Sequence, residues 1–284
     1  MARRALPYSS DRPSLEYLSH LGPHRVSVGE LSAIGVPGVV FAPVTGPRCP
    51  AVVFGHGYLQ PVGRYADTLR YLASWGFVAA APDTERGPVP SHAGLALDLA
   101  RTADRLADAK LGGGRVTVDR ARLAVAGHGT GGGAAVLAAA AGAPAFRAVA
   151  TVSATRVSPS AVRAAQAVTA PGLHLVGSKD HLAAAESGGE AIARAWAGPV
   201  QLRRLKGAAH LSLAEGKHWT SYFLGQTADQ GTQAGVRELL TAFLLLHVAG
   251  QDQLAESMAG KIAGTVPVEL SGTAGATAPT TLPR

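Results

Sequence analysis

Short apolar runs recur along the chain and alternate with segments whose apolar residues follow helical spacing. Three of these runs have the length of strands that are buried on both faces of a sheet: 51–54, 77–81 and 123–126. Amphipathic segments with the spacing of helices lie between them, at 64–75 and 93–111. This alternation predicts an α/β fold with a mostly parallel central sheet flanked by helices.

The alternation continues toward the C-terminus, with further strands predicted at 146–152, 172–177 and 200–205 and helices at 160–168, 190–196 and 233–248. Ahead of the first buried run, a strand pair is predicted at 25–28 and 38–43. We expect an N-terminal arm over 1–24, one domain over 25–264 and a flexible C-terminal tail over 265–284. The connection between 152 and 171 is too short for a cap domain, which predicts an open site.

The composition narrows the classes of protein. The 284 residues are 47% apolar and carry a formal net charge of +7, which is compatible with one large buried core. The basic residues are scattered and aromatic residues make up 5%, which argues against a nucleic-acid partner. We find neither the apolar core of a signal peptide nor a run of membrane-spanning length, so a cytoplasmic location is expected. The single cysteine, Cys49, has no partner for an internal disulfide.

The third apolar run ends in Gly127-His128-Gly129-Thr130-Gly131, between a predicted strand and a predicted helix. Serine hydrolases of the α/β type carry G-x-S-x-G at such a turn, which raises the serine oxygen at the carboxyl end of a central strand. Gly129 stands in the place of that serine and supplies no nucleophile. Thr130 lies one residue late, and the turn would direct its side chain away from a catalytic base.

The glycines of this turn also fit a dinucleotide-binding pattern. Gly127, Gly129 and Gly132 form G-x-G-x-x-G after a strand and before a helix. That fold expects an acidic residue at the end of the next strand. This chain has no acid there, although Ser153 and Arg156 would suit a 2′-phosphate. An NADP-binding domain is therefore the less favoured alternative, and a third interpretation is that the glycines only let strand and helix pack closely.

Asp180 and His210 follow Gly129 in the order that α/β-hydrolases use for the acid and the histidine, each after a predicted strand. In a hydrolase, Asp180 would orient the imidazole and His210 would act as general base. Taken singly, Asp180 is equally explained as a helix cap and His210 as a surface-loop histidine. Their shared order and context favour the paired interpretation.

An oxyanion hole requires two backbone N–H groups. Thr130, after the nucleophile position, and Tyr58, in the glycine-rich turn after 51–54, are the candidates. Tyr58 and His128 are also candidates for the substrate cleft, although His128, like His56, is equally explained by packing. No metal site is predicted, because neither histidine has a carboxylate or thiolate partner at ligand spacing.

With these positions assigned, the chain resembles the bacterial cutinase-like polyester hydrolases and related actinobacterial lipases, near the dienelactone-hydrolase and chlorophyllase branch of α/β-hydrolases. The resemblance covers roughly residues 22–250, and it rests on Gly22-Pro23, on 72–78 with 82–84, and on 118–128 with 131–134. Family members usually have Gly-His-Ser-x-Gly-Gly where this chain has residues 127–132. They are typically secreted and often disulfide-bonded, two traits that this sequence does not show.

The resemblance implies a carboxylic-ester hydrolase that retains the acid, the histidine and the oxyanion turn but is weak or inactive because its nucleophile is absent. It implies a small acyl or ester-like ligand and no cofactor. Three alternatives remain: a pseudo-hydrolase that binds a ligand or partner, an enzyme whose Asp180 and His210 activate water, and a deliberate Ser→Gly variant of an ordinary esterase. The sequence predicts no oligomeric state.

Overall fold

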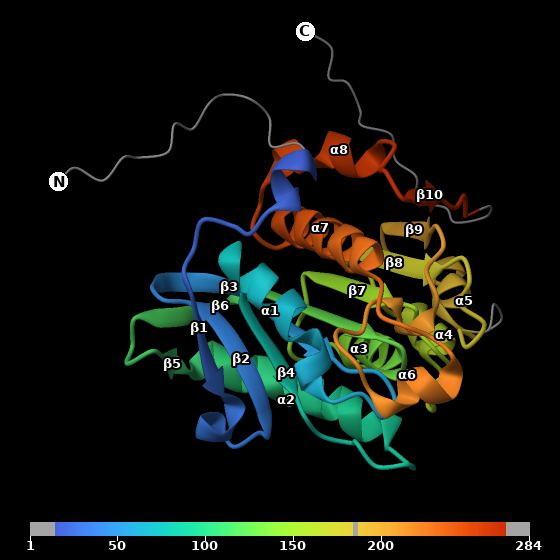
Figure 1. Ribbon diagram of the computed structural model, residues 1–284. Helices are drawn as coiled ribbons and strands as arrows, with labels where there is room; N and C mark the ends of the chain where they lie inside the picture. Colours follow the sequence, from blue (N-terminus) through green and yellow to red (C-terminus); the bar gives the residue numbers. More distant parts are fainter. Residues whose placement is uncertain (1–14, 184–186, 271–284) are drawn as a thin grey trace, which may run out of the picture.

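A computed structural model of the chain describes residues 15–183 and 187–270 (Figure 1). Its strands are β1 Val26–Glu30, β2 Gly38–Pro43, β3 Gly46–Gly55, β4 Val78–Pro82, β5 Lys110–Leu111, β6 Val116–His128, β7 Ala148–Val152, β8 Gly172–Gly177, β9 Val200–Leu205 and β10 Thr265–Pro267. Its α-helices are α1 Ala66–Ser74, α2 His92–Asp108, α3 Thr130–Ala140, α4 Ala161–Ala165, α5 Gly189–Arg194, α6 Trp219–Leu224, α7 Gln230–His247 and α8 Ala255–Ala259. Shorter 3-10 helices lie at Leu15–Ser19, Leu31–Ile34, Val62–Tyr65, His210–Ser212 and Asp252–Leu254.

The strands form one sheet in the order β1-β2-β4-β3-β6-β7-β8-β9-β10, with β5 paired to β6. The six strands from β4 to β9 in this order are parallel, and antiparallel strands extend both edges. The predicted α/β fold with a mostly parallel sheet flanked by helices is therefore confirmed. All the carboxyl ends of the parallel strands consequently meet at one edge, where α/β proteins place their ligands.

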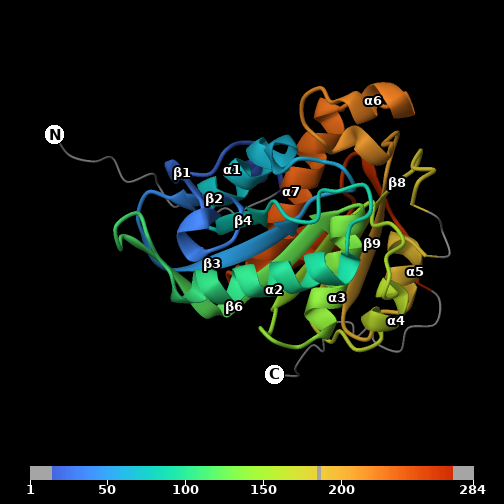
Figure 2. The ribbon, with the colours of Figure 1, turned by 90° about the horizontal axis from the view of Figure 1, so that it is seen from below.

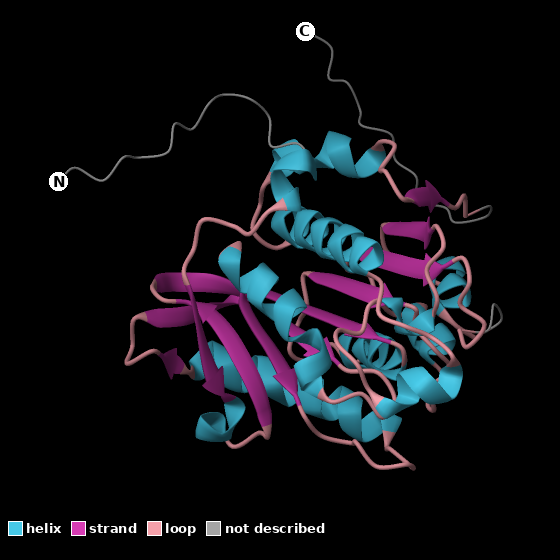
Figure 3. Cartoon of the chain, in the orientation of Figure 1, coloured by secondary structure: helices cyan, strands magenta, loops and turns pink. Residues whose placement is uncertain are grey.

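Helices cover both faces of the sheet, as Figures 2 and 3 show. Side chains alternate across β3: Val52 and Phe54 pack into the layer that contains α1 and α7, whereas Ala51 and Val53 pack into the layer that contains α2 and α3. Because both faces are buried, a parallel strand needs apolar residues at every position. This requirement is why the continuous apolar runs identified the central strands correctly.

The first half of β6 departs from the prediction. The helix predicted over 93–111 ends at Asp108, and Lys110–Leu111 pairs with β6 as a short strand. The strand predicted at 123–126 begins as early as Val116 and pairs with β3 from Gly46 onward. An ion pair between Arg48 and Asp119, 3.0 Å apart, joins the two strands there, and polar positions of this kind carry no strand-like pattern.

The fold extends beyond both of the predicted domain boundaries, at 24/25 and at 264/265. Leu18, in the predicted arm, is buried against the core that contains α7, and β10 adds to the sheet beyond the predicted boundary at 264. The predicted flexible tail otherwise falls mainly on 271–284, outside the described residues, as does the first part of the arm. Over the described ranges, no helix is long and apolar enough to cross a bilayer.

Candidate active site

The turn after β6 has the backbone shape of a nucleophile elbow. Gly129 lies between β6 and α3 with φ 56° and ψ −121°, a conformation that strains any residue with a side chain. A Cβ on Gly127 would lie 2.3 Å from the carbonyl oxygen of Gly131, and one on Gly131 would lie 2.2 Å from the Gly55 carbonyl. The glycines on either side of the elbow therefore serve the close packing of β6, α3 and β3.

Asp180 and His210 lie together at the carboxyl edge of the sheet. Asp180 follows β8 and His210 follows β9, and the Nδ1 of His210 is 2.9 Å from Oδ2 of Asp180. The Asp180 side chain is 1% exposed and the His210 side chain is 8% exposed. The other carboxylate oxygen of Asp180 accepts hydrogen bonds from the N–H groups of Leu182 and Ala183. The predicted contact is thus present, and Asp180 also caps the turn that follows it.

Hydrogen bonding keeps Asp180 ionised. Burial by itself raises the pKa of this carboxyl, but hydrogen bonds from His210, Ser153 and the Ala183 N–H, together with the charge of His210, outweigh burial and lower the pKa to about 2. An ionised Asp180 is the form that holds the N–H of His210 Nδ1 and leaves Nε2 as the proton acceptor.

His210 presents Nε2 to the elbow. A Cβ built on Gly129 would lie 3.2 Å from this nitrogen and 3.6 Å from the Cα of Gly57, in the turn after β3. The nucleophile position, the histidine and the candidate oxyanion turn therefore converge on one point. His210 itself is largely buried.

The expectation that His128 lines a substrate cleft is wrong. Its side chain is fully buried, because the ring lies behind His210 with centroids 4.9 Å apart. Its Nε2 is 2.8 Å from the carbonyl oxygen of His210, and its Nδ1 is 2.9 Å from the hydroxyl of Tyr65. Burial, then the charge of His210, lowers the pKa of His128 to about 3, so the ring is neutral at pH 7.

These contacts define one chain of hydrogen bonds behind the site. A carbonyl oxygen only accepts, so His128 carries its proton on Nε2 and donates to His210. Its Nδ1 then accepts from Tyr65, whose oxygen accepts from the N–H of Gly57 at 3.0 Å. The chain joins the turn after β3, the elbow and the backbone of His210. Sequence reasoning missed Tyr65 because an inward tyrosine on a helical segment has the pattern of ordinary core.

The two candidate oxyanion residues remain available. Thr130 is the first residue of α3, and the hydroxyl of Tyr58 donates to the carbonyl oxygen of Pro88 at 2.8 Å. In the part of the chain that the structure describes, no acceptor engages the backbone N–H of either residue. Of the two residues predicted to line the substrate cleft, Tyr58 is partly exposed to solvent, whereas His128 is buried.

Ser153 does not serve the dinucleotide alternative. Its side chain is buried and helps to lower the pKa of Asp180, so it belongs to the surroundings of that carboxylate. Its φ of 47° is unusual for a residue with a side chain. Ser153 is a part of the site that sequence reasoning assigned to another role. Its position directly after β7 could have indicated this role, because β7 lies next to β8, the strand that precedes Asp180.

No metal-binding group emerges: among the described residues, no three His, Cys, Asp or Glu side chains gather to hold an ion. His56 is buried, with Nδ1 2.9 Å from the Gly57 carbonyl oxygen and Nε2 2.8 Å from that of Thr84. Through these two contacts, His56 links the segments that follow β3 and β4.

The parallel sheet, the elbow and the paired acid and histidine define an α/β-hydrolase. Residues 11–223 match the family model described as PETase, PET hydrolase-like. The match covers most of the chain, which therefore belongs to this PET hydrolase-like family. A comparison with curated proteins finds no match. Family and fold together identify an esterase-like, cutinase-like α/β-hydrolase.

Proposed function

We propose that the chain binds a small acyl or ester-like ligand between Gly129, His210 and the turn after β3, and that it has lost turnover by the serine route. The observation that carries this proposal is the 3.2 Å between His210 Nε2 and a Cβ built on Gly129. The base is aimed at the place of a nucleophile, but glycine supplies no oxygen there. No acyl-enzyme can form at this position.

The rest of the machinery favours retained ligand binding. The ionised Asp180 fixes the ring of His210, and the N–H groups of Tyr58 and Thr130 are free to bind a carbonyl oxygen. Preorganised donors of this kind contribute binding and polarisation even without a covalent step. If the site no longer bound a ligand, mutations would be expected to disrupt the arrangement of Asp180, His210 and the two backbone N–H groups.

A second candidate is hydrolysis by water that His210 activates. The supporting observation is that Nε2 of His210 has no hydrogen-bond partner among the described residues, whereas Nδ1 is held by Asp180. A water beside Gly129 would then donate a proton to Nε2 and attack the ester carbon directly. This route predicts a slow esterase whose activity requires His210 and needs no side chain at position 129.

The decisive experiment compares Gly129→Ser with Gly129→Ala on hydrolysis of a short p-nitrophenyl ester. Loss of a triad serine typically costs about 10⁶ in kcat and leaves roughly 10³ to 10⁴ over water. We therefore expect Gly129→Ser to raise the rate by at least about 10²-fold. Gly129→Ala adds the same backbone strain, about 1–3 kcal/mol, without a hydroxyl, and is expected to give no gain.

The remaining outcomes separate the candidates. A folded Gly129→Ser protein that is no faster than Gly129→Ala contradicts an intact hydrolase site. Parent activity that His210→Ala abolishes favours the water mechanism over ligand binding alone. Calorimetry with NADP tests the dinucleotide alternative, for which we expect no micromolar binding.

A further inference from the structure

Helix α6 presents aromatic side chains to solvent. Trp219, Tyr222 and Phe223 are 57%, 74% and 83% exposed. Their spacing of three and four residues places them on one face of the helix. We call these three residues the α6 patch. Figure 2 shows α6 standing out from the body of the molecule. Exposed aromatic residues gathered in this way mark a surface that meets an apolar partner.

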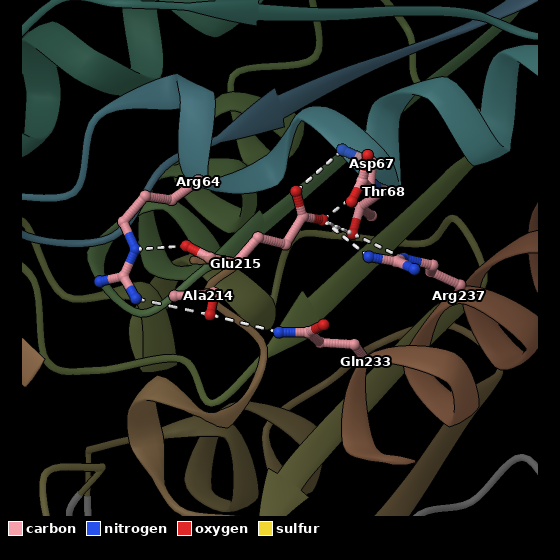
Figure 4. Close-up of polar contacts among 7 residues, drawn as sticks. All are labelled: Arg64, Asp67, Thr68, Ala214, Glu215, Gln233 and Arg237. Carbon is pink, nitrogen blue, oxygen red and sulfur yellow. Dashed lines mark hydrogen bonds and ion pairs between the residues drawn. The ribbon is translucent and has the colours of Figure 1, made fainter. Parts of the chain in front are cut away.

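The opposite face of α6 is fixed to the protein. Thr220 is buried, and its hydroxyl oxygen accepts from Nε2 of Gln60 at 3.0 Å. The buried Arg64 donates to the Ser221 hydroxyl at 3.3 Å and to the Glu215 carbonyl at 2.8 Å. Glu215 in turn binds α1 and α7 through Asp67, Thr68 and Arg237 (Figure 4). The outward aromatic residues are therefore held in place by the fold.

The segment that carries the patch is basic. Residues 216–228 contain no Asp or Glu, and the exposed Lys217 lies two residues before Trp219. The acids that flank this segment are engaged elsewhere: Glu215 pairs with Arg237, and Asp229 caps α7 through the N–H of Thr232. An aromatic face on a segment that carries a lysine and no acid is complementary to an anionic, apolar boundary.

We infer that the α6 patch docks this protein on an anionic lipid surface, with its rings at the headgroup level and Lys217 against the lipid charge. Aromatic side chains favour that level because their rings are amphipathic. A second copy of this chain is the less suitable occupant, since its net charge of +7 opposes self-association through a basic face.

Docking at α6 would bring the lipid surface to the catalytic edge. The N–H of Leu211, next to His210, donates to Oε1 of Gln226, just after α6, at 3.0 Å. Lipid bound at the patch would therefore lie beside the loop that carries the histidine. This consequence, delivery of a lipid acyl ester, rests on the proposed function; the docking itself does not.

The test is co-sedimentation of the full chain with vesicles of phosphatidylcholine, with and without phosphatidylglycerol. We expect binding that increases with phosphatidylglycerol. Because Trp219→Ser with Phe223→Ser removes two apolar rings from the contact with lipid, it should weaken binding by at least about tenfold. Lys217→Glu should weaken it several-fold on the anionic vesicles only. The matched control, Val28→Ser with Val266→Ser, removes exposed apolar residues from the edge strands and should bind normally.

Absence of binding to both vesicle types overturns the inference, as does binding that survives the double aromatic substitution. Aromatic-dependent dimers in solution without vesicle binding assign the patch to a second copy and overturn it as well. None of these measurements uses turnover. An inactive Gly129→Ser protein that still binds vesicles would contradict the proposed function and leave the docking surface intact.

Discussion

Gly129 has the backbone conformation of a nucleophile elbow but no side chain that could act as a nucleophile. The residue keeps the strained φ and ψ of an elbow, and its neighbours Gly127 and Gly131 keep the close packing that this turn needs. Glycine brings no side chain to this position. Since glycine adopts φ 56° at little cost, the turn forms without the strain that a side chain would add, and Asp180 and His210 are in contact beside it. A single residue thus decides whether this arrangement is a nucleophilic site.

Ser153 provides a prediction at the same scale. Its side chain is buried and helps to lower the pKa of the Asp180 carboxyl to about 2. Ser153→Ala removes one of the groups that favour the ionised carboxylate and should raise the pKa of Asp180. Carboxyl titration by NMR measures the shift.

Ser178→Ala is the matched control for that titration. Ser178 lies two residues from Asp180, but its hydroxyl oxygen accepts from the N–H of Gly207 at 2.8 Å. We expect no change in the Asp180 pKa from this substitution. An equal response of Asp180 to both serine substitutions would show that Ser153 does not act through its hydroxyl.

The sequence predicted those strands and helices whose buried positions recur at regular spacing. The central strands and α7 were predicted because their buried faces impose continuous or helical apolar patterns. α6 was not predicted, because its aromatic residues face outward and only Thr220 is buried. β10 was missed because three residues that pair with a distant strand carry no local signal. Asp180 and His210 were predicted from their order after successive strands, whereas the full burial of His128 depends on contacts that no local pattern encodes.

The loop after His210 is held by the partly buried carboxylate of Glu215, which gives a prediction at the scale of elements. The carboxylate of Glu215 accepts from the N–H groups of Asp67 and Thr68 at the start of α1 and pairs with Arg237 at 3.0 Å. Glu215→Gln leaves Arg237 without its counter-charge and weakens the interaction with the N-terminus of α1. We expect a loss of about 2–4 kcal/mol in the free energy of unfolding by urea.

The surface pair Arg120 and Asp104 is the control, because both side chains are about half exposed at 53% and 49%. Asp104→Asn should change the free energy of unfolding by less than about 0.5 kcal/mol. Similar losses from Glu215→Gln and Asp104→Asn would contradict the role assigned to Glu215 as an anchor for this loop.

For the whole molecule, the buried histidines set a dependence of stability on pH. Burial lowers the pKa of His174 to about 3, and burial with the charge of His210 lowers that of His128 to about 3. An unfolded histidine titrates near a pKa of about 6.5. Between these values the unfolded chain binds protons that the native protein excludes. Their contribution to stability is therefore complete above about pH 6.5 and is lost as the pH falls toward about 3.

Two such histidines give a slope of up to about 2.7 kcal/mol per pH unit between about pH 6 and 4, in addition to the carboxyl groups that titrate there. His174→Gln removes one titrating ring and should reduce that slope by about 1.4 kcal/mol per pH unit. Urea unfolding at a series of pH values measures both slopes, and above about pH 7.5 the two curves should run parallel. Equal slopes below about pH 6 would mean that His174 binds its proton equally in the folded and unfolded chains, contrary to the burial of its ring against Trp196.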